Sequence, residues 1–247
     1  MNYVLIFLMI FGMTASLPAD KSTKPATQPV VVLELFTSQG CSSCPPADNA
    51  LQAITQQATK SDQAVYGLSF HVDYWNRLGW ADPFSTKQYT DRQRQYNQRL
   101  NTQTYTPQLV INGRQDVVGG QRGRIAQIIQ TIQKQPASAF IGVDGTLVRD
   151  TKQVTVNYTL SAPGPYWVNV ALVQKEARTA VKNGENGGRI LVNTNVVRQF
   201  KTIDESGTSG SVTLPQPGGL NADQTVVLLY VQRNDNGQVI GAKQLSE

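Results

Sequence analysis

The only two cysteines of this chain, Cys41 and Cys44, are separated by two serines. They lie between an apolar, β-branched run at residues 30–36, which predicts a buried strand, and a helix expected to begin with Pro45. A helix N-terminus offers unpaired N–H groups and partial positive charge, both of which favour a thiolate. We therefore predict a redox pair, with Cys41 as the exposed attacking sulfur and Cys44, further inside the helix, as the resolving sulfur.

Two other chemistries fit the same pair. One is an inert structural disulfide, although a bond that closes so short a loop stabilises a fold little through chain entropy. The other is a metal site. The sequence holds a single histidine, His71, so a four-ligand zinc site would need a carboxylate such as Asp73. Two thiolates and His71 could also bind Cu(I), which prefers soft ligands. The redox interpretation needs no metal and no cofactor.

The pair Thr106-Pro107 directly precedes an expected strand at residues 108–111. If the peptide bond before this proline is cis, the Thr106 backbone would lie beside the sulfurs, where it could bind an extended peptide or cap the disulfide. The alternative is an ordinary trans proline that opens a strand. We include both residues among the candidate catalytic residues.

Three ionisable residues could serve the cysteines. Glu34 lies in the apolar strand, and burial there would raise its proton affinity, so it could accept the Cys44 proton through water. The alternative is a carboxylate satisfied by a local Arg, Ser or backbone donor. His71 and Asp73 end the second expected strand on one face, so Asp73 could orient His71 toward the sulfurs as a proton shuttle. The alternative is a hydrogen-bonded pair that anchors the segment that follows.

The elements expected around these residues fall into two groups, at residues 30–136 and 137–247. In the first group, strands are expected at 30–36 and 65–72 and in a hairpin over 108–118, whose Asn112-Gly113 pair signals a type I′ turn. Helices are expected from Pro45, from an N-cap at Ser85 to about Leu100, and up to Gln135. In the second group, strands are expected at 139–143, 154–160, 166–173, 190–200, 212–214, 226–231 and 239–242. Short strands with Gly- and Pro-containing turns favour an antiparallel sandwich.

The helix that starts at Ser85 is amphipathic. Tyr89 and Tyr96 share its apolar face, whereas its arginines, Arg92, Arg94 and Arg99, are interpreted as a solvated face.

Four longer motifs extend over most of the chain: ELFTSQGCSSCPPAD at residues 34–48, HVDYWNRLGWADPFS at 71–85, YTPQLVINGR at 105–114 and GENGGRILVNTNVVRQF at 184–200. Together they resemble a family of bacterial exported thioredoxin-like proteins that is catalogued only as a domain of unknown function. The resemblance implies an α/β thioredoxin-like domain followed by an all-β, antiparallel sandwich-like domain. It implies no reaction, because the family has no settled one and a fold alone does not give function.

The N-terminus predicts export. Residues 4–13 form an apolar run that is too short for a membrane span and is followed by small residues, as in a signal peptide. We assign residues 1–19 to the signal peptide and residues 20–29 to a polar linker, and we expect a periplasmic or secreted protein in which disulfides persist. The alternative is an uncleaved membrane anchor.

The composition excludes several classes of protein. Hydrophobic residues make up 40% of the chain and charged residues 16%, which does not fit a disordered chain. A net charge of +5 without a run of like charges does not indicate a nucleic-acid binder. We therefore expect a thiol–disulfide oxidoreductase whose partners are protein thiols and disulfides of the cell envelope. The alternatives are a Cu(I)-binding protein using Cys41, Cys44 and His71, or a non-catalytic interaction scaffold.

Overall fold

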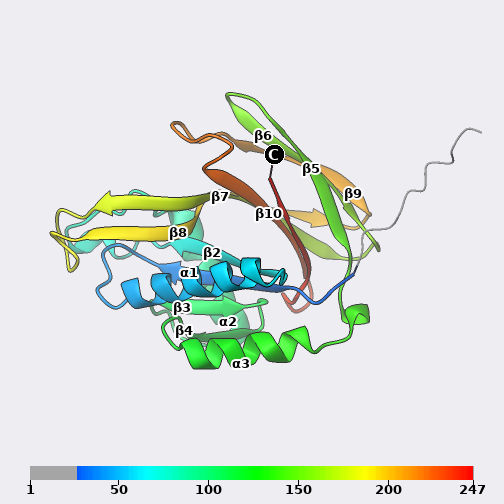
Figure 1. Ribbon diagram of the computed structural model, residues 1–247, viewed down its shortest axis with the longest axis horizontal. Helices are drawn as coiled ribbons and strands as arrows, with labels where there is room; N and C mark the ends of the chain where they lie inside the picture. The colour runs from blue at the N-terminus through cyan, green and yellow to red at the C-terminus, as the bar shows by residue number, and fades with distance from the viewer. Residues whose placement is uncertain (1–26, 247) are drawn as a thin grey trace, which may run out of the picture.

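The computed structural model describes residues 27–246. The predicted signal peptide, residues 1–19, lies outside them, as do residues 20–26 of the predicted linker. The described α-helices are α1 (Pro45–Lys60), α2 (Lys87–Leu100) and α3 (Arg122–Gln133), and the 3-10 helices are η1 (Asn76–Leu78) and η2 (Ala137–Ala139). The described strands are β1 (Val31–Thr37), β2 (Val65–His71), β3 (Gln108–Ile111), β4 (Gln115–Val118), β5 (Val143–Arg149), β6 (Gln153–Leu160), β7 (Tyr166–Ala180), β8 (Ile190–Glu205), β9 (Ser209–Pro215), β10 (Thr225–Arg233) and β11 (Val239–Leu245) (Figure 1).

Among residues 27–246, no helix combines the length and the apolar character that a membrane span requires.

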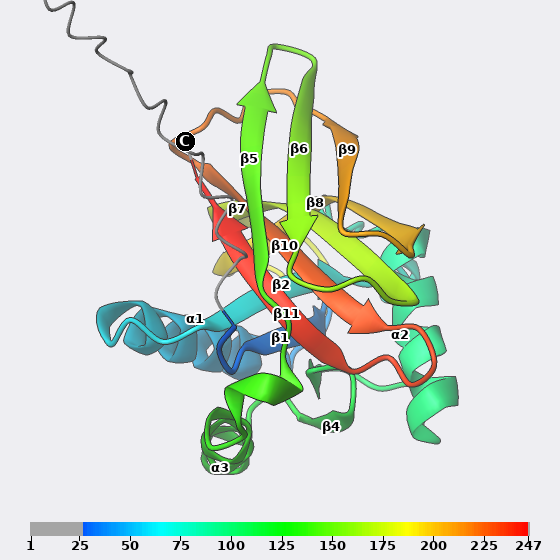
Figure 2. The ribbon, with the colours of Figure 1, turned by 90° about the vertical axis from the view of Figure 1, so that its right-hand side faces the viewer.

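One mixed sheet runs through both halves of the chain, in the strand order β11-β10-β7-β8-β2-β1-β3-β4. Strand β1 pairs in parallel with β2 and antiparallel with β3. The halves meet where β8 lies parallel to β2, with Ser69 opposite Val196. Strands β5, β6 and β9 form a separate antiparallel sheet, which Figure 2 shows in front of β7 and β10.

The expected fold class, a thioredoxin-like α/β domain followed by an all-β sandwich-like domain, is therefore wrong. Strands from both halves hydrogen-bond into the same eight-stranded sheet. The physical reason is the length of β7 and β8, which extend over 15 and 16 residues and exceed the runs expected from the sequence. Strand β8 consequently has β7 on one side and the end of β2 on the other.

Two hydrophobic cores cover the large sheet. The first mixes residues of both halves, and Phe70 of β2 meets Phe200 of β8 edge to face with ring centroids 5.2 Å apart. The second lies between the three-stranded sheet and the large sheet, with Val156 and Leu229 among its buried members. The shared first core joins the halves through packing as well as through the β2–β8 pairing.

Local turn chemistry follows the sequence closely. The hairpin between β3 and β4 turns at Asn112 and Gly113, whose φ angles of 46° and 67° fit the predicted type I′ turn. Helix α2 starts one residue later than expected. Its N-cap is Thr86, whose hydroxyl accepts a hydrogen bond from the Tyr89 N–H, instead of Ser85.

Arg92 lies in the first core, so its interpretation as part of a solvated face is wrong. Its side chain is 10% exposed and donates to the two oxygens of Glu34 at 2.6 and 3.0 Å. The same guanidinium donates to the Tyr230 hydroxyl of β10 and lies 4.6 Å from the ring centroid of Phe200. Helical spacing places Arg92 beside Tyr96, four positions on, and therefore on the apolar face of α2.

Replacing Arg92 by Met is expected to lower the free energy of unfolding by about 3–5 kcal/mol, because Glu34 would remain buried without its cation. Urea denaturation measures this loss. The matched control is Arg94→Met on the same helix, where the arginine side chain is 56% exposed and the expected change is below about 0.5 kcal/mol. Equal losses in the two variants would contradict a structural role for the Glu34–Arg92 ion pair.

Candidate functional site

The two cysteines form a disulfide at the start of α1, with their Cα atoms 5.4 Å apart. Pro45 and Pro46 occupy the first helical positions, as the sequence predicts, and Cys44 is the N-cap. The expectation that Cys44 lies inside the helix is wrong, because the first helical N–H groups, those of Ala47 and Asp48, both donate to the Cys44 carbonyl oxygen. Cys41 precedes the helix in a turn that the Cys44 N–H closes by donating to the Cys41 carbonyl.

Both cysteines are fully buried, so the expectation of an exposed Cys41 is also wrong. The two serines between them are exposed. The connection between β7 and β8 contacts this turn. Its Asn186 amide donates to the Cys41 carbonyl at 2.9 Å, and its Glu185 carboxylate accepts the Ser42 N–H at 2.9 Å. A distant part of the chain thus binds the backbone of the cysteine turn, and no local sequence pattern indicates this contact.

Thr106 lies beside the disulfide, as the sequence suggested, and its peptide bond to Pro107 is cis. The Thr106 hydroxyl is 3.4 Å from the Cys41 Sγ. Because this hydroxyl oxygen accepts a hydrogen bond from the Trp75 indole at 2.8 Å, its own hydrogen is free to point at the sulfur. A hydrogen bond donated to sulfur favours the thiolate, so this contact would stabilise a reduced, ionised Cys41.

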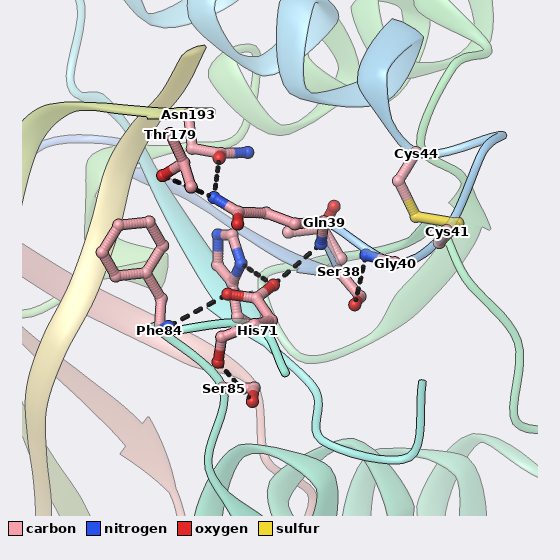
Figure 3. A network of polar contacts seen from close by, with 12 residues as sticks. Ser38, Gln39, Gly40, Cys41, Cys44, His71, Phe84, Ser85, Thr179 and Asn193 are labelled. Atoms are coloured by element: carbon pink, nitrogen blue, oxygen red, sulfur yellow. Dashed lines mark hydrogen bonds and ion pairs between the residues drawn. A yellow bond between two sulfur atoms is a disulfide. The ribbon is translucent and has the colours of Figure 1, made fainter. Parts of the chain in front are cut away.

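His71 is buried at the end of β2, where its Nδ1 lies 2.7 Å from an Asp82 carboxylate oxygen (Figure 3). Burial by itself would lower the pKa of His71 and raise that of Asp82. The attraction between the partners outweighs burial, so the pKa of His71 is raised and that of Asp82 is lowered. Asp73, the partner expected for His71, instead accepts a hydrogen bond from Thr90 at 2.6 Å. Strand β2 ends at His71, so the alternation that would align Asp73 with it does not continue.

Gln39 connects this ion pair to the cysteine turn. Its N–H donates to Asp82 at 2.8 Å, and its side-chain amide donates to Thr179 of β7 and Asn193 of β8 at 3.0 Å each (Figure 3). The backbone just before Cys41 is therefore held from the β2 side and from the β7–β8 hairpin.

The contacts of Glu34 do not support the suggested role of accepting the Cys44 proton. Its carboxylate binds Arg92 and also accepts the Tyr96 hydroxyl at 2.5 Å. The structure thus brings Glu34 together with α2 and not with the cysteines, in agreement with the alternative of a carboxylate satisfied by an arginine.

Asp48, like Asp82, is a buried ionisable residue that the sequence pattern did not single out. It follows Cys44 by one helical turn, on the same face of α1, and is 6% exposed. Burial raises its pKa to about 7, against the opposing effects of His71 and of the hydrogen bond from Thr37. The signal was an acid four positions after the second cysteine, on the side of the helix that carries Leu51.

The three residues suggested as Cu(I) ligands are not arranged as one set. Cys41 and Cys44 are joined to each other, and Nδ1 of His71 is paired with Asp82. Within residues 27–246, no group of three His, Cys, Asp or Glu side chains is arranged to hold a metal ion.

The fold and the site define a protein with a CxxC disulfide at a helix start and a sheet shared by both halves. The chain belongs to the family described as "Protein of unknown function (DUF1223)", whose model matches residues 32–232, so the predicted family relationship is confirmed. No curated protein matches the chain.

Two solved structures have a similar fold. One is the crystal structure of a protein from Agrobacterium tumefaciens, with 31% identity, a TM-score of 0.67, and coverage of 90% of this chain and 96% of that chain. The other is HBP35 of Porphyromonas gingivalis, with 16% identity, a TM-score of 0.62, and coverage of 90% of this chain and 76% of that chain. The second likeness shows the fold alone.

The raised pKa of Asp48 makes stability depend on pH. Between pH 4 and pH 7 the folded state keeps a proton that the unfolded state has lost, so wild-type stability falls as pH rises through this window. Asp48→Asn removes this loss. Its free energy of unfolding relative to wild type should rise by up to roughly 4 kcal/mol from pH 4 to pH 7 and then level off. Denaturant unfolding at several pH values measures the difference.

The control is Asp62→Asn, at an exposed carboxyl just after the same helix, whose positive φ of 50° asparagine tolerates well. A pH-independent difference between Asp48→Asn and wild type would contradict the assignment of a raised pKa to Asp48.

Proposed function

We propose that this protein is a thiol–disulfide oxidoreductase that exchanges disulfides with partner proteins outside the cytoplasm. The observation that carries the proposal is the contact of the Thr106 hydroxyl with the Cys41 Sγ, at the residue before a cis proline. An inert disulfide has no need of a hydrogen-bond donor aimed at one of its sulfurs, whereas a nucleophilic Cys41 is stabilised by it.

The exchange proceeds through a mixed disulfide. A thiolate of a partner dithiol attacks the Cys41 sulfur, the Cys41–Cys44 bond breaks, and Cys44 leaves as a thiolate that takes up a proton. The second partner thiolate then attacks the partner sulfur of the mixed disulfide and releases Cys41 as a thiolate. Two electrons have passed from the partner dithiol to the Cys41–Cys44 pair, and the same steps in reverse reduce a partner disulfide.

Asp48 suits the proton transfer to Cys44. It lies one helical turn away, it is buried, and its pKa of about 7 lets it hold or release a proton at neutral pH. At Cys41, the Ser43 hydroxyl adds a second polar contact to that of Thr106, at 3.4 Å from the Cys41 Sγ. The residues proposed to act in the exchange are thus Cys41, Cys44, Thr106 and Asp48, with Pro107 fixing the backbone beside them.

The predicted export supports this function, because disulfide exchange with protein partners is typical of oxidising compartments. Residues 1–19 are the segment predicted to be the signal peptide, and the proposed partners are protein thiols and disulfides of the cell envelope.

The reduction potential of the Cys41–Cys44 pair tests the proposal. Structural disulfides lie below about −300 mV, whereas exchanging pairs lie between roughly −270 and −120 mV. We expect a value in the second range, measured by equilibration with glutathione redox buffers. A potential below the structural limit would contradict the proposal and favour a scaffold that keeps the disulfide for stability.

A trapping experiment gives an independent readout. The reduced Cys44→Ser variant should accumulate a mixed disulfide through Cys41 when mixed with a model protein disulfide, because the resolving thiol is missing. Cys41→Ser is the matched control and should accumulate far less, since the Thr106 hydroxyl contacts the sulfur of Cys41 and not that of Cys44. Equal trapping by the two variants would refute the assignment of Cys41 as the nucleophile.

A further inference from the structure

Residues 181–189, which connect β7 to β8 and are here termed the hairpin cap, lie against the cysteine turn although they are about 140 positions away in sequence. Figure 1 shows the tip of this long hairpin at the same end of the molecule as the start of α1. The hairpin cap is held in a defined conformation by its own hydrogen bonds, among them those from the Val181 N–H to Arg189 and from the Gly188 N–H to Val181.

Asn186 is the buried centre of the hairpin cap. Its side chain is fully buried, and its amide nitrogen donates to the carbonyl oxygens of Gln39 and Cys41 at 2.9 Å each. Its amide oxygen accepts from Arg189 at 2.6 Å, so the side chain is satisfied on both sides. Two carbonyl groups on either side of Gly40 therefore receive their donor from a residue that is remote in sequence.

Two neighbouring residues complete the contact. The Glu185 carboxylate accepts the Ser42 N–H at 2.9 Å, and Gly184, with a φ of 74°, approaches Trp80 so closely that an added Cβ would lie 3.2 Å from the Trp80 Cβ. The amide of Asn186 and the carboxylate of Glu185 thus donate and accept where the N–H and C=O groups of an extended peptide would pair with the cysteine turn.

We propose that the hairpin cap occupies the binding position of an extended segment of the partner protein, and that Asn186 must leave the Gln39 and Cys41 carbonyls before a partner thiol reaches Cys41. The proposal rests on the proposed function and adds its substrate class, a cysteine in an extended polypeptide whose backbone replaces the Asn186 and Glu185 contacts. It also accounts for a fully buried Cys41 that is followed directly by two exposed serines.

Rates of disulfide reduction by a small and a large dithiol test whether the hairpin cap limits access to Cys41. Dithiothreitol and a dithiol-bearing protein are each added in excess to the oxidised full-length protein. In Asn186→Ala, the rate with the protein dithiol should rise at least about tenfold, because two hydrogen bonds to buried carbonyls are lost. The rate with dithiothreitol should rise less, because a small molecule needs a smaller opening. Asn183→Ala is the matched control in the exposed part of the hairpin cap and should reduce like wild type.

A second variant keeps the test decisive if Asn186→Ala does not fold. Replacing residues 182–188 by Asn-Gly joins Val181 to Arg189, which are already hydrogen-bonded, through a two-residue turn and removes the contact altogether. It should also raise the rate with the protein dithiol at least about tenfold. Unchanged rates with both dithiols in either folded variant would overturn the proposal. Neither measurement needs a physiological partner. Unchanged reduction rates would contradict only the role of the hairpin cap, whereas failure of Cys44→Ser to trap a mixed disulfide would contradict the proposed function.

Discussion

The pairing of β8 with β2 is the constraint on which the site depends. Strand β8 is hydrogen-bonded along its length to β7 and lies parallel to β2 at Ser69 and Val196. Because β2 also carries His71 at its end, this contact fixes the β7–β8 hairpin relative to the cysteine turn. The hairpin then supplies Thr179 and Asn193 to Gln39, and its tip supplies Asn186 to the carbonyl of Cys41. The β2–β8 sheet contact therefore determines which residues contact the cysteine turn.

Two buried ion pairs reinforce this contact between the two halves of the chain. Arg92 of α2 binds Glu34 of β1 and also contacts aromatic rings of β8 and β10, so the ion pair has partners from both halves of the chain. His71 and Asp82 form the second pair, and Asp82 reaches the backbone of Gln39. Buried ion pairs add little net stability compared with apolar packing, but each is costly to break. They consequently favour one arrangement of the two halves over its alternatives.

The same arrangement gives the disulfide two opposed properties. The Thr106 hydroxyl favours a thiolate at Cys41, and Asp48 offers a buried proton acceptor near Cys44, which suits exchange chemistry. The contacts of Glu185 and Asn186 bind the backbone at the same cysteine, where the hairpin cap is proposed to hold the place of a partner segment. A site that is chemically prepared and sterically closed is consistent with exchange that depends on displacement of the hairpin cap, and with protection of the pair from unrelated thiols.

The local features of the fold follow from patterns within a few residues of sequence. Two cysteines before a Pro-started helix, a Thr-Pro pair before a strand and an Asn-Gly turn each place their constraint within a few residues, and the structure has the disulfide, the helix start and the hairpin where these patterns indicate. Helical spacing also indicates burial of Arg92 and Asp48, because each lies on the same helix face as buried neighbours.

Long-range contacts, in contrast, set which strands share a sheet, which carboxylate faces His71, and whether Cys41 is exposed. Asp82 takes the place expected for Asp73 because β2 ends at His71 and the connection that follows brings Asp82 back to the histidine. Asn186 contacts Cys41 although the two residues are 145 positions apart. Period and propensity describe each strand's own faces. They do not specify which other strand will pair with its backbone groups, because backbone N–H and C=O groups are the same in every strand.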